Sequence, residues 1–294
     1  MKAAVVGGNG QLGADLCLAL SAAGHEVLAL NHTDVEIGSV DSVTQVIRQA
    51  RPDAIINTAA LHHVERCESD PLLAYTVNAL GPRNLAIAAE ETGAILVQIS
   101  TDYVFDGSKR DPYLESDNPA PLNVYGNTKL AGEHYVRGIA GRSFVLRTSA
   151  LYGHAPCRGK GGLNFVELML KLAAEREEIR VVNDEFVSPT WTMELARQIA
   201  TLLRTDAYGV FHATAESSCS WYDFATEIFR LTGTRVKLSV ALPNTFFAKT
   251  PRPKYSVLEN ERLKVTGLNH FRDWPRGLRE YLGARVMASR TPRR

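Results

Sequence analysis

The chain has 294 residues, of which 45% are hydrophobic and 22% charged, as expected of a globular protein with a substantial buried core. Its 33 Lys and Arg residues nearly balance its 32 Asp and Glu residues, which leaves a formal charge of +1. This balance argues against a nucleic acid as the main partner, because nucleic-acid binding relies on a basic surface.

The cysteines and the first residues bear on the cellular compartment. Cys17, Cys67, Cys157 and Cys219 form neither a CxxC pair nor a zinc-binding spacing. The first apolar run stops at Gly7, which is too short for a signal-peptide core or for a membrane span of about 20 residues. We therefore expect a cytoplasmic protein with no metal site and no membrane segment.

Strands and helices alternate through the first half of the chain. The apolar runs of strand length are residues 3–6, 27–30, 54–56, 95–99 and 144–146. Between the first two runs, leucines recur at four-residue spacing, which predicts an amphipathic helix. Because parallel strands need crossover helices, this alternation predicts a doubly wound parallel α/β sheet of the Rossmann type over residues 1–150.

A glycine motif follows the first predicted strand. Gly7, Gly10 and Gly13 are spaced by three, between an apolar strand and a helix. In such a loop glycines allow a tight turn and the close approach of a pyrophosphate, while the helix N-terminus attracts the anion. We expect a dinucleotide here, with Gln11 and Leu12 contacting it mainly through their backbone. The alternative is a glycine turn selected only for tight packing.

The residues after the second predicted strand bear on the choice of dinucleotide. An acid that binds the ribose 2′-hydroxyl is expected about 20 residues after the glycines. This strand instead ends with Asn31 and His32, and Asp34 comes only later. Since no carboxylate at the strand end repels a 2′-phosphate, we expect NADP(H) to be preferred and NAD(H) to be accepted.

Polar residues that suit redox chemistry follow the fourth predicted strand. Thr101 and Asp102 emerge at the carboxyl edge of the sheet, where ligands of open α/β folds bind. Tyr125 and Lys129 are four residues apart, on one face of a predicted helix. A neighbouring cation stabilises phenolate, so Lys129 should lower the pKa of Tyr125. With Thr101 holding the substrate oxygen, these residues predict a carbonyl–alcohol redox site; a surface helix pair without catalytic role is the alternative.

The pattern changes after residue 150. A glycine-rich stretch, a helix, two short strands and a capping-box pattern are predicted in turn at residues 153–162, 164–176, 180–182, 210–213 and 220–223. We expect a smaller, mainly substrate-binding lobe over residues 151–283, with a segment at about 183–215 returning to the first domain. The arginine-rich residues 284–294 predict a basic, disordered tail.

A basic loop in the second half is a candidate anchor for a diphosphate. Lys249, Arg252 and Lys254 lie close together in the sequence, and two prolines restrict the backbone between them. The alternative is a solvated loop with ordinary basic residues.

Taken together, the motifs resemble those of the short-chain dehydrogenases/reductases of the extended type, and among these the dTDP-4-dehydrorhamnose reductases. The resemblance covers nearly the whole chain, roughly residues 1–283. It is carried by residues 57–60, 65–68, 77–79, 100–105, 121–126, 129–133, 183–184, 188–190, 252–258 and 273–274.

The resemblance implies roles for individual residues. Tyr125 would donate a proton to the 4-keto group of a nucleotide-linked 6-deoxysugar, Lys129 would lower its pKa and hold the nicotinamide ribose, and Thr101 would complete the site. The implied cofactor contacts beyond the glycine loop are Asn31, Glu36, Ile37, Ala60, Leu61 and His62. The implied substrate contacts are Asp102, Tyr103, Val104, Ala150 and Arg252. Ala150 departs from the family, which often has Trp there.

These observations predict an NAD(P)H-dependent reductase that most resembles the enzymes converting dTDP-4-dehydrorhamnose to dTDP-L-rhamnose. One alternative is a nucleotide-sugar epimerase or dehydratase that retains its cofactor. Another is a non-catalytic, NADP-binding regulatory subunit. The sequence leaves open a Mg²⁺ requirement and assembly into a homodimer.

Overall fold

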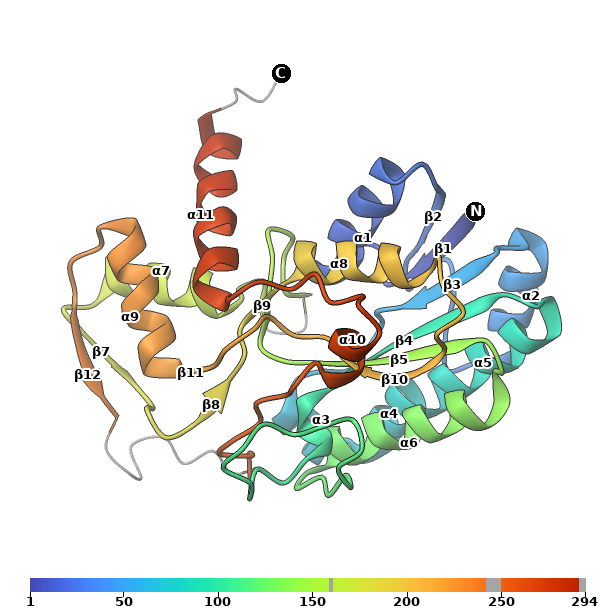
Figure 1. The fold of residues 1–294 in the computed structure, drawn as a ribbon, viewed down its shortest axis with the longest axis horizontal. Coiled ribbons are helices and arrows are strands. Elements are labelled where there is room, and N and C mark those ends of the chain that lie inside the picture. The colour runs from blue at the N-terminus through green and yellow to red at the C-terminus, as the bar shows by residue number, and fades with distance from the viewer. Residues whose placement is uncertain (159–160, 242–249, 291–294) are drawn as a thin grey trace.

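A six-stranded parallel sheet forms the centre of the larger of two lobes (Figure 1). The computed structural model describes residues 1–158, 161–241 and 250–290, with side chains up to residue 285. Every neighbouring pair of strands is parallel. In order across the sheet, the strands are β10 (Gly209–His212), β5 (Ser143–Thr148), β4 (Ile95–Thr101), β3 (Ala54–Asn57), β1 (Lys2–Val6) and β2 (Glu26–Leu30). The predicted doubly wound α/β fold is confirmed.

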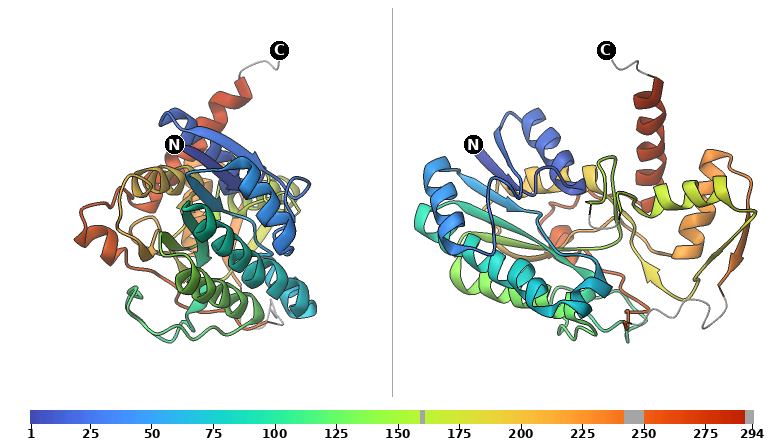
Figure 2. Two further views of the ribbon diagram at one scale, coloured as in Figure 1. Left: turned by 90° about the vertical axis from the view of Figure 1, so that its right-hand side faces the viewer. Right: turned by 180° about the vertical axis from the view of Figure 1, so that it is seen from behind.

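Helices cover both faces of this sheet, as the end-on view shows (Figure 2). Alternate residues of each strand point to opposite faces, so each central strand contributes to two hydrophobic cores. This two-sided burial explains why the strands are continuous apolar runs in the sequence. One face carries α1 (Gln11–Ala22) and α8 (Thr192–Leu202), and the other carries α2 (Val40–Ala50), α5 (Gly81–Thr92) and α6 (Val124–Ile139).

The chain reverses its direction across the sheet between β1 and β3. From β1 it moves outward to β2 at one edge, and β3 then pairs with the other side of β1. In open α/β sheets, ligands bind at the carboxyl ends of the strands beside such a switch point. The loops after β1 and β3 therefore border the expected binding crevice.

Short helices connect the sheet to its covering helices near this crevice. The helix that begins at Pro71 is capped by Asp70, whose side chain accepts a hydrogen bond from the backbone of its first turn. These elements are α3 (Val64–Ser69), α4 (Pro71–Tyr75), the π-helix η1 (Thr76–Leu80) and the 3₁₀-helix η2 (Asp102–Val104).

A smaller lobe with its own hydrophobic core lies beside the sheet, as the view from behind also shows (Figure 2). The predicted capping box is confirmed, because the Ser220 and Asp223 side chains each accept from the other's backbone N–H.

The remaining helices and strands of the two lobes are β6 (Leu151–Tyr152), α7 (Phe165–Glu175), β7 (Glu178–Val181), β8 (Phe186–Val187), β9 (Thr190–Trp191), β11 (Cys219–Ser220), α9 (Trp221–Thr232), β12 (Lys237–Val240), α10 (Glu261–Val265) and α11 (Trp274–Arg290).

The C-terminal helix corrects one expectation. α11 continues through residues 284–290, so the predicted disordered tail is wrong for this segment, while the last four residues lie outside the described part. The fully buried Tyr281 packs this helix into the core of the smaller lobe. Arg285 also forms a 3.0 Å ion pair with Glu167 of α7, which ties the helix down one turn further.

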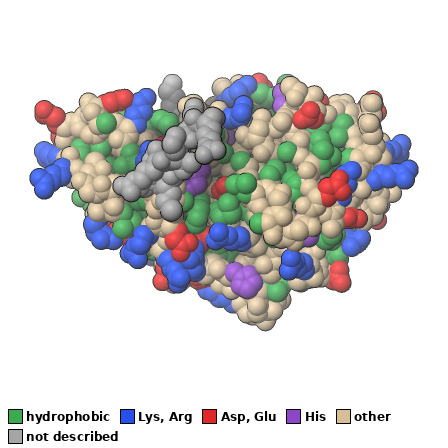
Figure 3. Space-filling view, turned by 90° about the horizontal axis from the view of Figure 1, so that it is seen from above, with side chains coloured by type: hydrophobic (Ala, Val, Ile, Leu, Met, Phe, Trp, Pro, Cys, Tyr) green, Lys and Arg blue, Asp and Glu red, His purple; other side chains and the backbone are tan. Residues whose placement is uncertain are grey.

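The surface and the helices bear on possible partners. Acidic and basic side chains are mixed over the face seen from above, without a large area of one sign (Figure 3). Within the described residues, the helices are too short or too polar for any of them to span a bilayer.

Candidate active site

The glycine loop after β1 has the geometry of a phosphate-binding turn. Gly7 has a φ of +82°, which favours glycine, and its N–H donates to the Leu30 carbonyl at 2.8 Å. A Cβ on Gly13 would lie 2.1 Å from the Gly7 carbonyl oxygen, so glycine is needed for α1 to pack this closely. At Gly10 a Cβ would meet the same oxygen at 3.1 Å, a tight contact that also favours glycine at the helix N-terminus. Within the described residues no side chain caps α1, whose first N–H groups have no intrahelical partners.

The residues that follow the glycines present their backbone to this space. Leu12 is buried in the core, and the Gln11 side chain donates to the Gly153 carbonyl at 3.4 Å. From the same glycine-rich stretch, the Arg158 guanidinium donates to the Asn9 carbonyl at 3.3 Å. The start of the second lobe therefore lies against the glycine loop, a contact that sequence spacing did not indicate.

The loop after β3 is held by a buried asparagine. The Leu61 N–H donates to Asn78 Oδ1, and Asn78 Nδ2 donates to the Leu61 carbonyl, both at 2.9 Å. Ala60, Leu61 and His62 are half-buried in this loop, and His62 Nε2 lies 3.5 Å from Cys157 Sγ. The structure thus brings these predicted cofactor contacts to the switch point. The sequence had marked Asn78 only within a resembling motif, because its partner lies 17 residues away.

The predicted adenosine contacts divide into available and buried groups. Asn31 Oδ1 is buried and lacks a hydrogen-bond partner among the described residues. The carboxylate of Asp34 accepts from the Asn31 N–H at 2.7 Å. Glu36 is partly exposed and lies 3.3 Å from His32. Ile37, by contrast, is buried in the core, so little of its side chain is open to a nucleotide base, contrary to its predicted role.

Tyr125, Thr101 and Lys129 come together at the carboxyl edge of the sheet. Asn123 caps α6 by accepting from the Gly126 N–H at 2.9 Å, which places Tyr125 in the first turn and Lys129 one turn later. Thr101 ends β4 and forms a hydrogen bond with the Tyr125 phenol. The predicted i, i+4 arrangement on one helix is confirmed.

The pKa of Tyr125 corrects the predicted acidification. Burial raises the pKa of this phenol, and the hydrogen bond with Thr101 lowers it by less. The Lys129 ammonium points to the backbone, where it donates to the Ile99 carbonyl at 2.6 Å. The phenol therefore keeps its proton at neutral pH, which suits a proton donor.

Lys129 itself is strongly affected by burial. Only 4% of its surface is exposed, and desolvation lowers the pKa of Lys129 to about 8, while Glu133 acts in the opposite direction. Glu133 is engaged from the other side by Arg147, at 2.8 Å, and by the Ser100 hydroxyl, at 2.5 Å. This buried cluster fixes α6 to β4 and β5 directly behind the ammonium group.

The other residues predicted to contact substrate differ in how far their side chains are exposed. Tyr103 lies edge-on to Tyr125, with ring centroids 5.8 Å apart, and can border a sugar. Val104, also predicted to contact substrate, is fully buried against Phe105, so it is not exposed to a sugar in this structure. Asp102 is 4% exposed, and protein hydroxyls occupy both of its oxygens, so its predicted direct contact is wrong.

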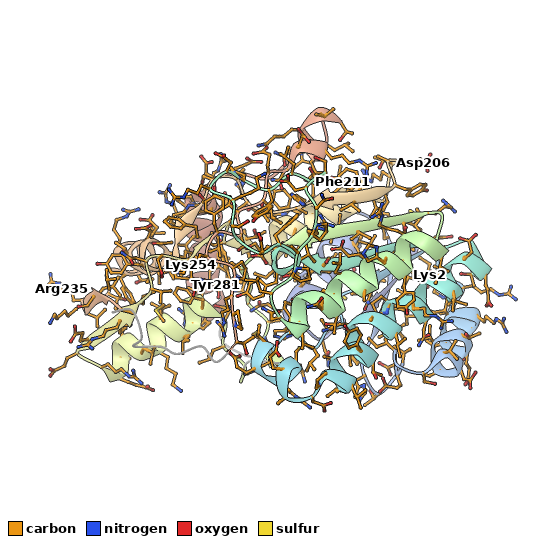
Figure 4. The ribbon with its side chains drawn as sticks, turned by 90° about the horizontal axis from the view of Figure 1, so that it is seen from below. Lys2, Asp206, Phe211, Arg235, Lys254 and Tyr281 are labelled. Carbon is orange, nitrogen blue, oxygen red and sulfur yellow. The ribbon has the colours of Figure 1, made fainter. Side chains whose placement is uncertain are left out.

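The basic loop lies between the two lobes. Figure 4 labels Lys254 between Arg235, at the far end of the smaller lobe, and Lys2 in the sheet. Arg252 forms a 2.5 Å ion pair with Glu65 of α3, so the larger lobe already supplies one anionic partner. The third predicted anchor, Lys249, lies outside the described residues.

The turn at Ala150 has an unusual backbone conformation. Ala150 has a φ of +44°, a left-handed conformation that is strained for a residue other than glycine. Such strain at the position where the family often has Trp marks this turn as a place where the chain departs from the pattern.

The described residues contain no group of three or more His, Cys, Asp or Glu side chains placed to hold a metal ion.

Comparison with known proteins places this site in context. A family model described as the RmlD substrate binding domain matches residues 1–287. The chain is 40% identical to the spore coat polysaccharide biosynthesis protein SpsK of Bacillus subtilis, over 98% of this chain and 99% of that protein.

Two solved structures are similar over almost their whole length. A dTDP-4-dehydrorhamnose reductase of Clostridium acetobutylicum has 41% identity and a TM-score of 0.93, covering 98% of this chain and 100% of the other. The dTDP-4-dehydrorhamnose reductase of Bacillus anthracis, solved in complex with NADP, has 38% identity and a TM-score of 0.92, covering 96% and 99%.

Proposed function

Because the chain belongs to the RmlD family, we propose that it is an oxidoreductase that reduces the 4-keto group of a nucleotide-linked 6-deoxysugar with NADPH. The substrate we propose is dTDP-4-dehydrorhamnose, and the product is dTDP-L-rhamnose. The observation that carries the proposal is the meeting of Tyr125, Thr101 and Lys129 beside the glycine loop.

The residues around the glycine loop suit a dinucleotide. The glycine turn and the N-terminus of α1 suit a pyrophosphate. The half-buried loop at Leu61 suits the phosphates, and Asn31 Oδ1, which has no hydrogen-bond partner in the described part of the chain, suits the adenosine ribose. When bound, NADPH supplies a hydride to the carbonyl carbon.

The chain's own residues manage the proton and the orientation. Tyr125 donates its proton to the carbonyl oxygen as that oxygen gains charge, and Thr101 holds the phenol in place through their hydrogen bond. Lys129 keeps a positive charge one helical turn from the phenol, which stabilises the phenolate left after proton transfer. Solvent then returns the proton to Tyr125.

Residues from both lobes would hold the nucleotide-sugar. Tyr103 borders the sugar beside Tyr125, and Arg252 binds the diphosphate by exchanging its partner Glu65 for a phosphate oxygen. Ala150 leaves room where the family often has an indole ring. More residues therefore support the assignment of the ketone reduction than support the assignment of the sugar.

A turnover assay tests this proposal. Purified protein is mixed with dTDP-4-dehydrorhamnose and NADPH, and we expect loss of NADPH absorbance with formation of dTDP-L-rhamnose. Tyr125→Phe should remove turnover while NADPH affinity stays within about twofold, since the phenol acts on the proton and the glycine loop acts on the phosphates. Full turnover by this variant would refute the assignment of the acid.

The same assay separates the alternatives. An epimerase or dehydratase that retains its cofactor would convert sugar without net loss of NADPH. A regulatory subunit would bind NADPH without turnover and would co-purify with a second enzyme. Parallel assays with NADH, with a metal chelator and with added Mg²⁺ test the cofactor preference and metal requirement, and light scattering tests for a homodimer.

A further inference from the structure

The carboxylate of Asp102 lies where three separate segments of the chain meet. Its Oδ1 accepts from the Thr101 hydroxyl at 3.0 Å. Its Oδ2 accepts from the Ser149 hydroxyl, just after β5, at 2.9 Å, and from the Ser256 hydroxyl at 2.5 Å. Asp102 is 4% exposed and Ser256 is 1% exposed. A buried carboxylate with three hydroxyl donors is a costly arrangement that is tolerated only when its hydrogen bonds are satisfied.

This carboxylate fixes the direction of the Thr101 hydroxyl group. Thr101 has a single hydroxyl proton, and it points to Asp102. The lone pairs of the same oxygen then accept from the Tyr103 N–H at 3.2 Å, and Thr101 is also the hydrogen-bonding neighbour of the Tyr125 phenol. Loss of the carboxylate would let the Thr101 hydroxyl rotate, although its place at the end of β4 would not change.

Ser256 connects this arrangement to the rest of the C-terminal segment. The Ser256 N–H donates to the Phe186 carbonyl of β8 at 3.0 Å, which anchors the segment to the smaller lobe. Five residues earlier, the Pro251 carbonyl accepts from Asn123, the residue that caps α6. The segment from Pro251 to Ser256 therefore contacts the supports of both Thr101 and Tyr125.

We propose that Asp102 is a positioning residue for the ketone reduction. It holds the Thr101 hydroxyl toward Tyr125, and Ser256 completes this support when the C-terminal segment is seated on the larger lobe. The proposal rests on the proposed function, because the reacting centre it serves is the Tyr125 site. Asp102 acts through Thr101 and makes no contact with substrate.

A double-mutant cycle tests whether Asp102 acts through Thr101. We expect Asp102→Asn to lower kcat by about tenfold or more, because misorientation of one group has this scale of effect, with NADPH affinity within about twofold of the wild type. In a Thr101→Ala background the same substitution should lower kcat by less than about twofold, since the group it positions is gone. An equal fold-decrease in kcat in both backgrounds, or an undiminished kcat for Asp102→Asn, would overturn the proposal.

A serine pair supplies the matched control. Ser256→Ala should lower kcat severalfold and lose this effect when combined with Asp102→Asn. Ser143 is also buried, but it lies at the opposite end of β5 and donates to the Ala140 carbonyl. Ser143→Ala should leave kcat unchanged even if both variants lose thermal stability equally. A similar loss of kcat in both serine variants would contradict a positioning role.

A structural readout separates this proposal from the proposed function. If the wild-type protein consumes no NADPH with any keto-sugar nucleotide, the proposed function fails. The crystal structure of Asp102→Ala then decides the positioning role by itself: we expect the Thr101 hydroxyl to leave the Tyr125 phenol. An unchanged Thr101 side chain in that structure would reject the role whether or not turnover is found.

Discussion

The ammonium group of Lys129, a residue of α6, donates to the backbone carbonyl of Ile99 at 2.6 Å. This hydrogen bond holds the charge inside the protein, at the base of the reacting centre. Because the site is buried, the pKa of Lys129 falls to about 8, close enough to neutrality to affect activity.

The pH dependence of turnover should follow this amine. Since the charged form stabilises the phenolate, kcat should be constant below the pKa of Lys129, about 8, and decrease as the pH rises through that value. An ordinary exposed lysine would lose its charge only near pH ~10.4. The measurement is kcat between about pH 6 and about pH 10. A flat profile across this range would contradict the role of Lys129, and Lys129→Met should give a low kcat without the alkaline decrease.

The glycine loop offers a test in which cofactor binding and stability separate. A Cβ at Gly10 would meet the Gly7 carbonyl oxygen at 3.1 Å, a milder conflict than at Gly13, so Gly10→Ala should lower the melting temperature only slightly but weaken NADPH binding by about tenfold or more through loss of phosphate approach. A Cβ at Gly13 would overlap the Gly7 carbonyl, so Gly13→Ala should also lower stability, by about 1–3 kcal/mol. Fluorescence titration with NADPH and thermal unfolding measure the two effects.

Gly138 is the control for these substitutions. It lies in α6 with no atom near the position of a Cβ, so Gly138→Ala should raise stability by about 0.5 kcal/mol and leave NADPH affinity unchanged. Unaltered NADPH binding in the Gly10→Ala variant would refute the phosphate site.

Arg252 should affect substrate more than cofactor or stability. Its ion pair with Glu65 is about one-third exposed, so its loss should change the free energy of unfolding by less than about 1 kcal/mol. Arg252→Ala should raise KM for the nucleotide-sugar by about tenfold or more, because a charged hydrogen bond to the diphosphate is lost. Lys254→Ala, in the same loop but paired with Asp184, should have a smaller effect. Equal KM changes for the two variants would show that Arg252 is no specific anchor.

His212 should make the protein sensitive to acid. It is fully buried at the end of β10, where burial and the charge of Arg147 lower the pKa of His212 to about 3. An unfolded histidine has a pKa near ~6.5, so below that pH the unfolded state binds the proton more strongly than the folded state. The free energy of unfolding should therefore be highest above about pH 6.5 and decrease toward pH 3.

Urea unfolding at several pH values measures this dependence. His212→Gln should cost stability at neutral pH, and its deficit relative to the wild type should shrink as the pH falls, because only in the wild type does unfolding let this residue bind a proton, which favours the unfolded state. The exposed His270 gives the control, and His270→Gln should not change the pH dependence. A constant difference between wild type and His212→Gln would disprove the assignment.

The sequence predicted the elements of the site better than their environments. The glycine spacing, the helical separation of Tyr125 and Lys129, and the position of Thr101 after a strand are local patterns, and the structure contains each of them. The pKa of Tyr125 was predicted in the wrong direction, because desolvation depends on side chains from distant segments. For the same reason the sequence placed Val104 against substrate, whereas the fold buries it.

Amino-acid order alone therefore determined the Rossmann sheet, the glycine loop and the placement of Tyr125 and Lys129 on one helix, since periodicity and glycine spacing act over a few residues. Only the tertiary structure decided that Asp102 receives hydroxyls from Ser149 and Ser256, and that Arg252 already pairs with Glu65. These contacts join positions from 47 to 187 residues apart. Burial and charge at such places depend on how the two lobes pack, which local sequence patterns do not encode.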